Sequence, residues 1–150
     1  MVSLKRYPMK RLEIYIDGAS KGNPGPSSIG VIICRDGKTI KNIARYIGNA
    51  TNNAAEYTAL IFALQEALAL GAESVNINTD SQLLCRQVRK IYRVRNAGIA
   101  KLYNKAVGLM DNFKEVNVKH LPRHENVGAD KLANIAVRKG IAQGYSLLDG

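Results

Sequence analysis

The spacing of apolar residues changes once along this chain, near residue 50, and this change constrains the fold more than any other feature. Before it, apolar and polar residues alternate in short runs, which is the pattern of β-strands. After it, runs with apolar residues three or four positions apart, typical of helices, are separated by two short alternating runs. We therefore expect strands first, and then helices alternating with strands.

The first third of the chain predicts three strands, at about residues 12–17, 29–34 and 39–47. A loop rich in glycine and proline separates the first two strands. Asp36 and Gly37 form a typical hairpin turn between the second and third strands, so these strands should make an antiparallel meander.

The rest of the chain predicts four helices and two further strands. Leu84, Val88 and Ile91 share one apolar stripe of the second helix, and Asn126 is expected to cap the last helix. Helical crossovers imply parallel pairing of the strands that they join. We expect an α/β protein with one mixed five-stranded sheet, three antiparallel strands followed by two parallel ones, flanked by helices. The expected helices cover residues 52–70, about 80–91, 97–110 and 126–139, and the strands cover residues 74–79 and 114–120.

The length of 150 residues suits a single folded domain, expected at residues 11–140, between a basic arm (1–10) and a tail (141–150). No apolar run approaches the ~20 residues of a membrane span, and the N-terminus lacks the apolar stretch of a signal peptide. Cys34 and Cys85 lie far apart in the sequence and are interpreted as reduced thiols. We expect a cytoplasmic monomer with no membrane contact.

The chain carries a net charge of +10, from 22 basic and 12 acidic residues, which indicates a polyanionic partner such as nucleic acid. The excess is concentrated between Asp80 and Asp111, where no acidic residue occurs. A pair of solvated helix faces is the alternative explanation, although such faces usually mix both signs. The cations of this basic segment, residues 81–110, are Arg86, Arg89, Lys90, Arg93, Arg95, Lys101 and Lys105.

Four carboxylates stand where the predicted strands end or the predicted helices begin: Asp17, Glu56, Asp80 and Asp130. Each has an ordinary explanation. Asp17 can start a turn, and Glu56 can complete a capping box with Asn53. Asp80 can be a helix N-cap, and Asp130 can interact with a helix dipole.

Taken together, the four carboxylates favour a metal site. Glu56 is in register with Leu60 and Ala63, so it should face the core side of its helix. Ligands of α/β sheets collect beyond the carboxyl ends of strands, where Asp17 and Asp80 are expected. Converging acids repel one another unless a cation neutralises them, and oxygen ligands suit Mg²⁺ or Mn²⁺. A metal site in a polyanion-binding protein suggests phosphodiester chemistry.

Four segments resemble ribonuclease HI in order and spacing: "YIDGASKGNPGPSSIG", "TNNAAEYTAL", "NTDSQLL" and "HENVGADKLANIA". The resemblance implies a ribonuclease H-like fold for residues 11–140 and an endonuclease that hydrolyses the RNA strand of RNA–DNA hybrids. It implies a two-metal-ion mechanism with Mg²⁺ or Mn²⁺, giving 5′-phosphate and 3′-hydroxyl ends. The implied metal ligands are Asp17, Glu56, Asp80 and Asp130.

The same resemblance implies contacts with the substrate. Thr51 matches a position in a pocket for a DNA-strand phosphate, and plain helix capping is the alternative. The residues that match minor-groove contacts are Asn23, Asn52, Asn53 and Gln82.

Two departures from the family pattern affect these expectations. The basic segment is shorter than the family pattern requires for the extra helix and basic loop that many members use to hold the hybrid, so its own cations are expected to substitute. The loop "LPRHEN" offers His124 or Arg123 as the residue that assists turnover, in preference to His120, which is expected to end a strand and pack.

Two other functions stay open for this fold. One is a non-catalytic nucleic-acid-binding module, and the presence of all four acids argues against it. The other is a DNA nuclease or resolvase, and the segments "TNNAAE" and "GNPG" favour the hybrid-specific enzyme instead.

Overall fold

The computed structural model describes residues 11–149, so the basic arm expected at residues 1–10 lies outside the described residues. The elements are β1 (Arg11–Ser20), β2 (Gly25–Arg35), β3 (Lys38–Ala50), α1 (Asn52–Ala69), β4 (Ser74–Thr79), α2 (Gln82–Val88), α3 (Ala97–Met110), β5 (Glu115–His120), a 3₁₀ turn (Arg123–Glu125) and α4 (Val127–Asp149).

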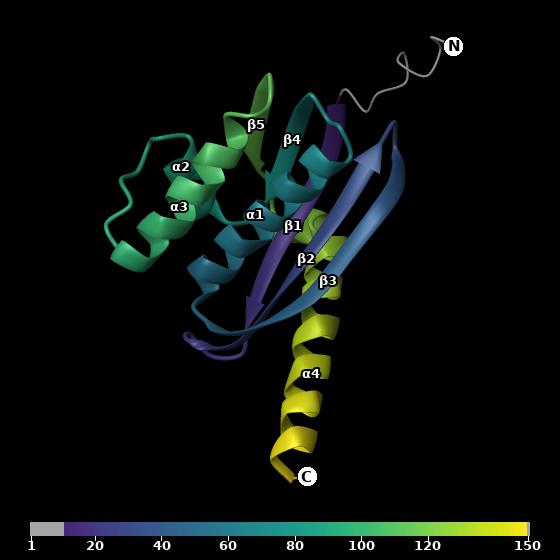
Figure 1. Cartoon of the computed structure of the whole chain (residues 1–150), viewed down its shortest axis with the longest axis vertical. Helices are drawn as coiled ribbons and strands as arrows, with labels where there is room; N and C mark the ends of the chain where they lie inside the picture. Colours follow the sequence, from purple (N-terminus) through teal and green to yellow (C-terminus); the bar gives the residue numbers. More distant parts are fainter. Residues whose placement is uncertain (1–10, 150) are drawn as a thin grey trace.

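The five strands form one sheet in the order β3-β2-β1-β4-β5 (Figure 1). β1 pairs with β2, and β2 with β3, in antiparallel fashion. β4 runs parallel to β1, and β5 runs parallel to β4. The mixed five-stranded sheet that the sequence predicts is therefore confirmed.

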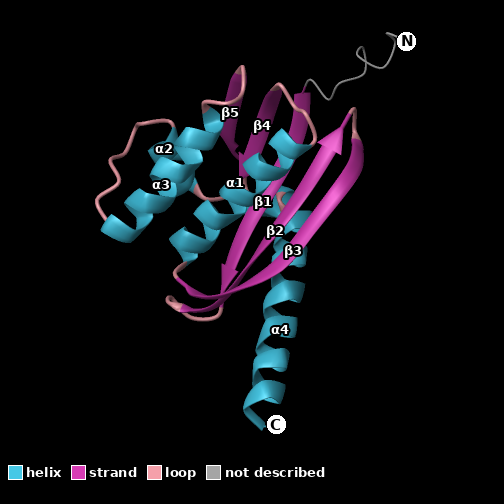
Figure 2. Ribbon diagram, in the orientation of Figure 1, coloured by secondary structure: helices cyan, strands magenta, loops and turns pink. Residues whose placement is uncertain are grey.

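Helices cover both faces of this sheet (Figure 2). α1 and α3 lie together on one face, and α4 packs on the other, against β1, β2 and β3. Two glycines allow these close approaches. A Cβ atom on Gly18 would lie 2.6 Å from the main chain of α1 at Glu56, and one on Gly30 would overlap the main chain of α4 at Ala129.

The main hydrophobic core lies between the sheet and α1. Leu12, Ile14 and Ile16 of β1 are fully buried, as are Tyr57 and Leu60 of α1. Burying one such side chain contributes about 1.5–3 kcal/mol. The core therefore holds α1 firmly against β1 and sets the position of Glu56, the neighbour of Tyr57.

The prediction that the second helix continues through Ile91 is wrong. α2 ends at Val88, and Ile91 is exposed. Lys90 adopts a left-handed φ of 64°, its N–H donates to the Gln87 carbonyl, and the Ile91 N–H donates to the Arg86 carbonyl. These two bonds form a Schellman motif, which ends a helix regardless of any apolar residue that follows.

Two other boundaries differ from those predicted. β1 continues three residues beyond Asp17, because its far end still pairs with β2 through Ser20. The last helix runs to Asp149 instead of stopping near Lys139. Residues 141–149, for which the sequence predicts a tail, therefore continue this helix.

Both cysteines are free thiols; Cys85 is buried, and Cys34 is half-buried near the end of β2. Within residues 11–149, no helix combines the length and the hydropathy needed to cross a membrane.

Candidate active site

The strand register brings Asp17 and Asp80 together. The last parallel pair between β1 and β4 is Ile16 with Thr79. Asp17 and Asp80 directly follow these two residues, so they lie where β4 stops and β1 loses its neighbour on that side. Asp17 remains paired with Gly30 on its other side. The position of Asp17 is therefore set by strand pairing and not by a turn.

Glu56 approaches the same two carboxylates from α1. The glycine after Asp17 allows the main chain of α1 at Glu56 to approach β1. The side chain of Glu56 consequently faces the sheet, as its register with the apolar face predicted.

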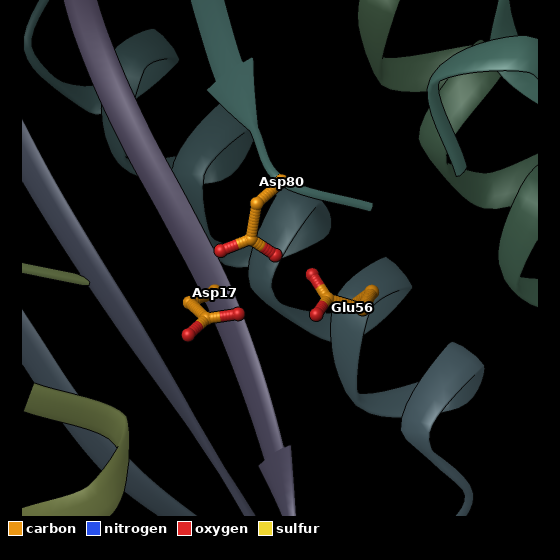
Figure 3. Close-up of side chains that lie close together, drawn as sticks. All are labelled: Asp17, Glu56 and Asp80. Atoms are coloured by element: carbon orange, nitrogen blue, oxygen red, sulfur yellow. The ribbon is translucent and has the colours of Figure 1, made fainter. Parts of the chain in front are cut away.

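The carboxylates of Asp17, Glu56 and Asp80 each offer an oxygen atom within 4.8 Å of the other two. Figure 3 shows these groups pointing toward one another from β1, α1 and the end of β4. Asp17 is 2% exposed and Glu56 is 9% exposed. Asp17 Oδ1 accepts a hydrogen bond from the Gly18 N–H at 3.0 Å, whereas Asp17 Oδ2 and Glu56 Oε2 are buried without any hydrogen-bond partner.

Burial and mutual repulsion raise the pKa of two of these groups. Burial, followed by the charge of Asp80, raises the pKa of Asp17 to about 7, and Asp130 adds to this effect. Burial, followed by the charge of Asp17, raises the pKa of Glu56 well above its ordinary value. The ionised form of both carboxylates is therefore unfavourable unless a cation is bound beside them.

This arrangement fits a divalent cation. A buried carboxylate oxygen without a partner is costly, and two such oxygens here lie in one cluster of three acids. Hard divalent cations such as Mg²⁺ and Mn²⁺ prefer carboxylate oxygen ligands. Binding a cation would satisfy both unpaired oxygens and relieve the repulsion that raises the pKa values.

The local geometry excludes three of the four ordinary explanations. Asp17 lies within a strand and not in a turn. Thr51, instead of Asn53, caps α1, so Glu56 belongs to no capping box; Ser81, instead of Asp80, caps α2. The dipole explanation for Asp130 remains, because Asp130 lies in the first turn of α4.

Asp130 lies outside the group of three carboxylates, although its charge acts on Asp17. Its own carboxylate is oriented within α4, where Asn134 Nδ2 donates to Asp130 Oδ1 at 3.1 Å and to the Asp130 carbonyl at 2.9 Å. The structure thus brings three predicted ligands into direct proximity and holds the fourth nearby.

The residues predicted to contact substrate lie around the start of α1 and of α2. Asn23 Oδ1 accepts a hydrogen bond from the Asn52 N–H at 3.0 Å, which ties the loop after β1 to α1. Asn53 Oδ1 is buried without a partner, and Gln82 is exposed in the first turn of α2. Thr51 Oγ1 accepts from the Ala54 N–H at 3.1 Å, so its capping role is present in the structure.

The loop before α4 is a 3₁₀ turn, in which Arg123 is exposed. His124 is also open to solvent, with its side chain 81% exposed and Nε2 lying 3.7 Å from Glu125 Oε2. His120 ends β5 as predicted, but its side chain is exposed. The expectation that His120 packs is wrong, because His120 is exposed at the end of β5, which is an edge strand.

The basic segment contains one preorganised pair. Arg86 Nη1 donates to the Tyr92 hydroxyl at 2.7 Å, and its guanidinium lies 5.2 Å from the centre of the Tyr92 ring. Residues 89–96 contain no helix between α2 and α3. A hollow of about 520 Å³ opens beside this connection, lined by Lys90, Ile91, Tyr92, Arg93, Val94, Ala100, Tyr103 and Asn104.

Asn126 has a position that sequence reasoning missed. It was expected to cap the last helix, but its side chain is buried and donates to the Ile16 carbonyl and to Asp80. An asparagine directly before a helix is an ordinary cap signal. No sequence pattern distinguishes such a cap from an amide that turns inward.

Comparison with known proteins points to the same family as the sequence motifs do. The pattern of the reverse transcriptase-like family matches residues 15–136. The ribonuclease HI of Halobacterium salinarum is 38% identical over 128 residues, which is 85% of this chain and 64% of that protein. The chain therefore spans less than two thirds of that curated relative.

Solved structures resemble the whole fold. The crystal structure of RNase H1 from Halobacterium salinarum has a TM-score of 0.84 and 37% identity, covering 86% of this chain and 98% of that one. LC11-RNase H1 in complex with an RNA/DNA hybrid has a TM-score of 0.83 and 35% identity, covering 87% and 99% respectively. The matched family pattern, the identity and the shared fold show that this chain belongs to the ribonuclease HI family.

Proposed function

We propose that the protein is an endonuclease that hydrolyses the RNA strand of RNA–DNA hybrids. The observation that carries this proposal is the convergence of Asp17, Glu56 and Asp80, two of which keep a buried oxygen unpaired. Membership of the ribonuclease HI family and the hybrid bound by LC11-RNase H1 support the choice of substrate.

Two divalent cations, Mg²⁺ or alternatively Mn²⁺, are proposed as cofactors. The residues that hold them are Asp17, Glu56, Asp80 and Asp130. Divalent cations held by these carboxylates would supply an activated water for attack and charge stabilisation for the leaving 3′ oxygen, which would give 5′-phosphate and 3′-hydroxyl ends. The chain itself keeps the carboxylates of Asp17 and Glu56 buried, which strengthens their interaction with a cation.

Recognition of the hybrid is assigned to residues beside this site. The amide groups of Asn23, Asn52, Asn53 and Gln82 offer donors and acceptors suited to 2′-hydroxyls and base edges of a minor groove. Thr51 contributes a hydroxyl for a phosphate of the DNA strand while it caps α1. Arg123 and His124 lie at the exposed turn before α4, where they can assist turnover.

We also propose that the protein acts in the cytoplasm as a monomer. The two free thiols suit a reducing compartment, in which disulfides are rare. The basic segment suits a partner that is nucleic acid and not a second copy of the same positively charged chain.

The test is a cleavage assay with labelled RNA–DNA hybrid, duplex RNA and duplex DNA, each with Mg²⁺ or with EDTA. We expect cleavage of only the RNA strand of the hybrid, and only with Mg²⁺. The Asp17→Asn variant is the control for a contaminating nuclease. It replaces a single buried carboxylate oxygen of the proposed site by an amide nitrogen, so a contaminant would still cleave in this sample. Tight hybrid binding without cleavage would indicate the binding module, and cleavage of duplex DNA would indicate a DNA nuclease.

A further inference from the structure

Asn126 contacts the carboxylate cluster through Asp80 and is 1% exposed. Its Nδ2 donates to the Ile16 carbonyl of β1 at 2.8 Å and to Asp80 Oδ2 at 3.2 Å. Asp80 follows the last residue of β4, so no strand pairing holds it. The amide of Asn126 is therefore a direct restraint on the direction of the Asp80 carboxylate.

The main chain of Asn126 connects this restraint to α4. Its N–H donates to the Arg123 carbonyl at 2.9 Å, which closes the 3₁₀ turn, and its carbonyl accepts from the Asp130 N–H at 3.2 Å. A single residue thus joins β1, the end of β4 and the first turn of α4. Two of the proposed cation ligands, Asp80 and Asp130, are hydrogen-bonded to it.

We propose that Asn126 is a positioning residue that orients Asp80, and anchors the turn carrying Asp130, toward a common cation site. This inference rests on the proposed function, because it assumes that these carboxylates hold Mg²⁺. Groups that orient metal ligands typically change metal affinity about 10- to 100-fold when they are removed. Asn126 does not itself contact the cation or the substrate in this proposal.

The chemistry of the amide explains why asparagine occupies this place. Both bonds require an N–H donor, and Nδ2 supplies two hydrogens from one atom. The Oδ1 atom is buried without a partner, so burial of this side chain is not favoured by satisfied hydrogen bonding alone. The presence of asparagine at this position is therefore better explained by the two acceptors that its Nδ2 binds, the Ile16 carbonyl and Asp80, than by a contribution to packing.

The chain offers a matched control in Asn78 of β4. Asn78 is 3% exposed, and its Nδ2 also bridges a β1 carbonyl and a carboxylate, namely Ile14 O at 3.1 Å and Glu13 Oε2 at 2.6 Å. Glu13 is not a proposed cation ligand. Removing either amide breaks an equivalent pair of bonds, but only one pair includes the carboxylate cluster.

The experiment titrates the full chain with Mg²⁺ alone, without nucleic acid, and follows backbone amide shifts by NMR to obtain Kd. Melting temperatures are measured in EDTA. We expect Asn126→Ala to raise Kd for Mg²⁺ about 10- to 100-fold, and Asn78→Ala to leave Kd within twofold of the wild type. Both variants should lower Tm. Asn126→Ser, whose hydroxyl is too short to bridge both acceptors, replaces the alanine variant if that variant does not fold.

A double-mutant cycle separates positioning from loss of stability. If Asn126 acts through Asp80, adding Asn126→Ala to Asp80→Asn should change Mg²⁺ affinity by much less than the single change does. An Asn126 variant with wild-type Kd and a lowered Tm would overturn the inference while leaving the cation site intact. A wild-type chain that binds no Mg²⁺ would instead overturn the proposed function.

Discussion

Asp17 and Glu56 come from a strand and a helix that pack through Gly18, and their carboxylates lie within 4.8 Å of each other. Each keeps one buried oxygen without a hydrogen-bond partner, Oδ2 in Asp17 and Oε2 in Glu56. This pair is stable as two negative charges only when a cation is shared between them. The relationship leads directly to predictions for the metal-bound and metal-free protein.

Replacing the carboxylates should separate activity from stability. Asp17→Asn, Glu56→Gln and Asp80→Asn should each reduce hybrid cleavage by at least about 10²-fold, because a metal ligand should contribute at least as much as a general acid or base. The same variants should keep or raise Tm in EDTA, because each relieves repulsion between the acids. Cleavage rates and melting curves for each variant check this, and near-normal cleavage by Asp17→Asn would refute the metal site.

The metal-free protein should lose stability as pH rises. The pKa of Asp17 is about 7 in the folded chain, whereas a carboxylate in an unfolded chain titrates near pH 4. The folded state therefore binds the proton more tightly than the unfolded state does. The resulting contribution of Asp17 to the free energy of unfolding is lost as pH rises from about 4 through about 7. Denaturant unfolding in EDTA across this range should show the decline.

Mg²⁺ should reverse that loss, since it replaces the proton as partner of the carboxylates. Asp17→Asn supplies the control, because it removes the titrating group and should give a flatter pH profile in EDTA. A wild-type profile that rises with pH between 4 and 7 would contradict the assignment.

The basic segment should contribute to the affinity for the hybrid and not to the cleavage step. Neutralising Arg86, Arg89 and Arg93 together should weaken hybrid binding and flatten the log–log salt dependence by up to about 0.9 per lost phosphate contact. Arg86 is already held by Tyr92, so little ordering is needed when it binds. Single-turnover cleavage at saturating protein should change little.

Cations at the far end of the sheet provide the control for this prediction. Arg35, Lys38 and Lys41 lie at the hairpin beside the start of β1, away from Asp17. Neutralising them should leave the salt dependence nearly unchanged. Equal effects of both triple variants would mean that net charge matters and not the location of the basic segment.

The residues of the loop before α4 should tune turnover without being indispensable, because in the proposed mechanism the carboxylate cluster carries the chemistry. Asp17→Asn should be the most damaging change, Asp130→Asn intermediate, and His124→Ala or Arg123→Ala milder. The exposed position of His120 changes its expected effect: His120→Ala should shift stability by no more than about 0.5 kcal/mol. Turnover at several Mg²⁺ concentrations and thermal melts check the series.

Lost turnover in His120→Ala with an unchanged melt would assign the loop role to His120. Silent His124→Ala and Arg123→Ala variants would complete that reversal, since they would show that the exposed 3₁₀ turn takes no part in turnover.

The sequence by itself determined the type and order of the elements, and the identity of the candidate ligands. Apolar spacing is a local property, so the switch near residue 50 was enough to predict the meander, the crossovers and the mixed sheet. Each acid lies in its own short motif, and for this reason Asp17, Glu56, Asp80 and Asp130 could be selected without coordinates.

Only the tertiary structure decided which of these groups meet and what holds them. Asp17 is not at the end of β1; it lies close to Asp80 because pairing with the parallel strand β4 stops one residue earlier, and that depends on register between distant segments. α2 ends where Lys90 turns left-handed, despite the apolar residue that follows. The inward turn of Asn126 depends on acceptors from β1 and from the residue after β4. Strand register and the buried hydrogen bonds of Asn126 depend on contacts between distant segments, which the spacing of residues along a chain does not encode.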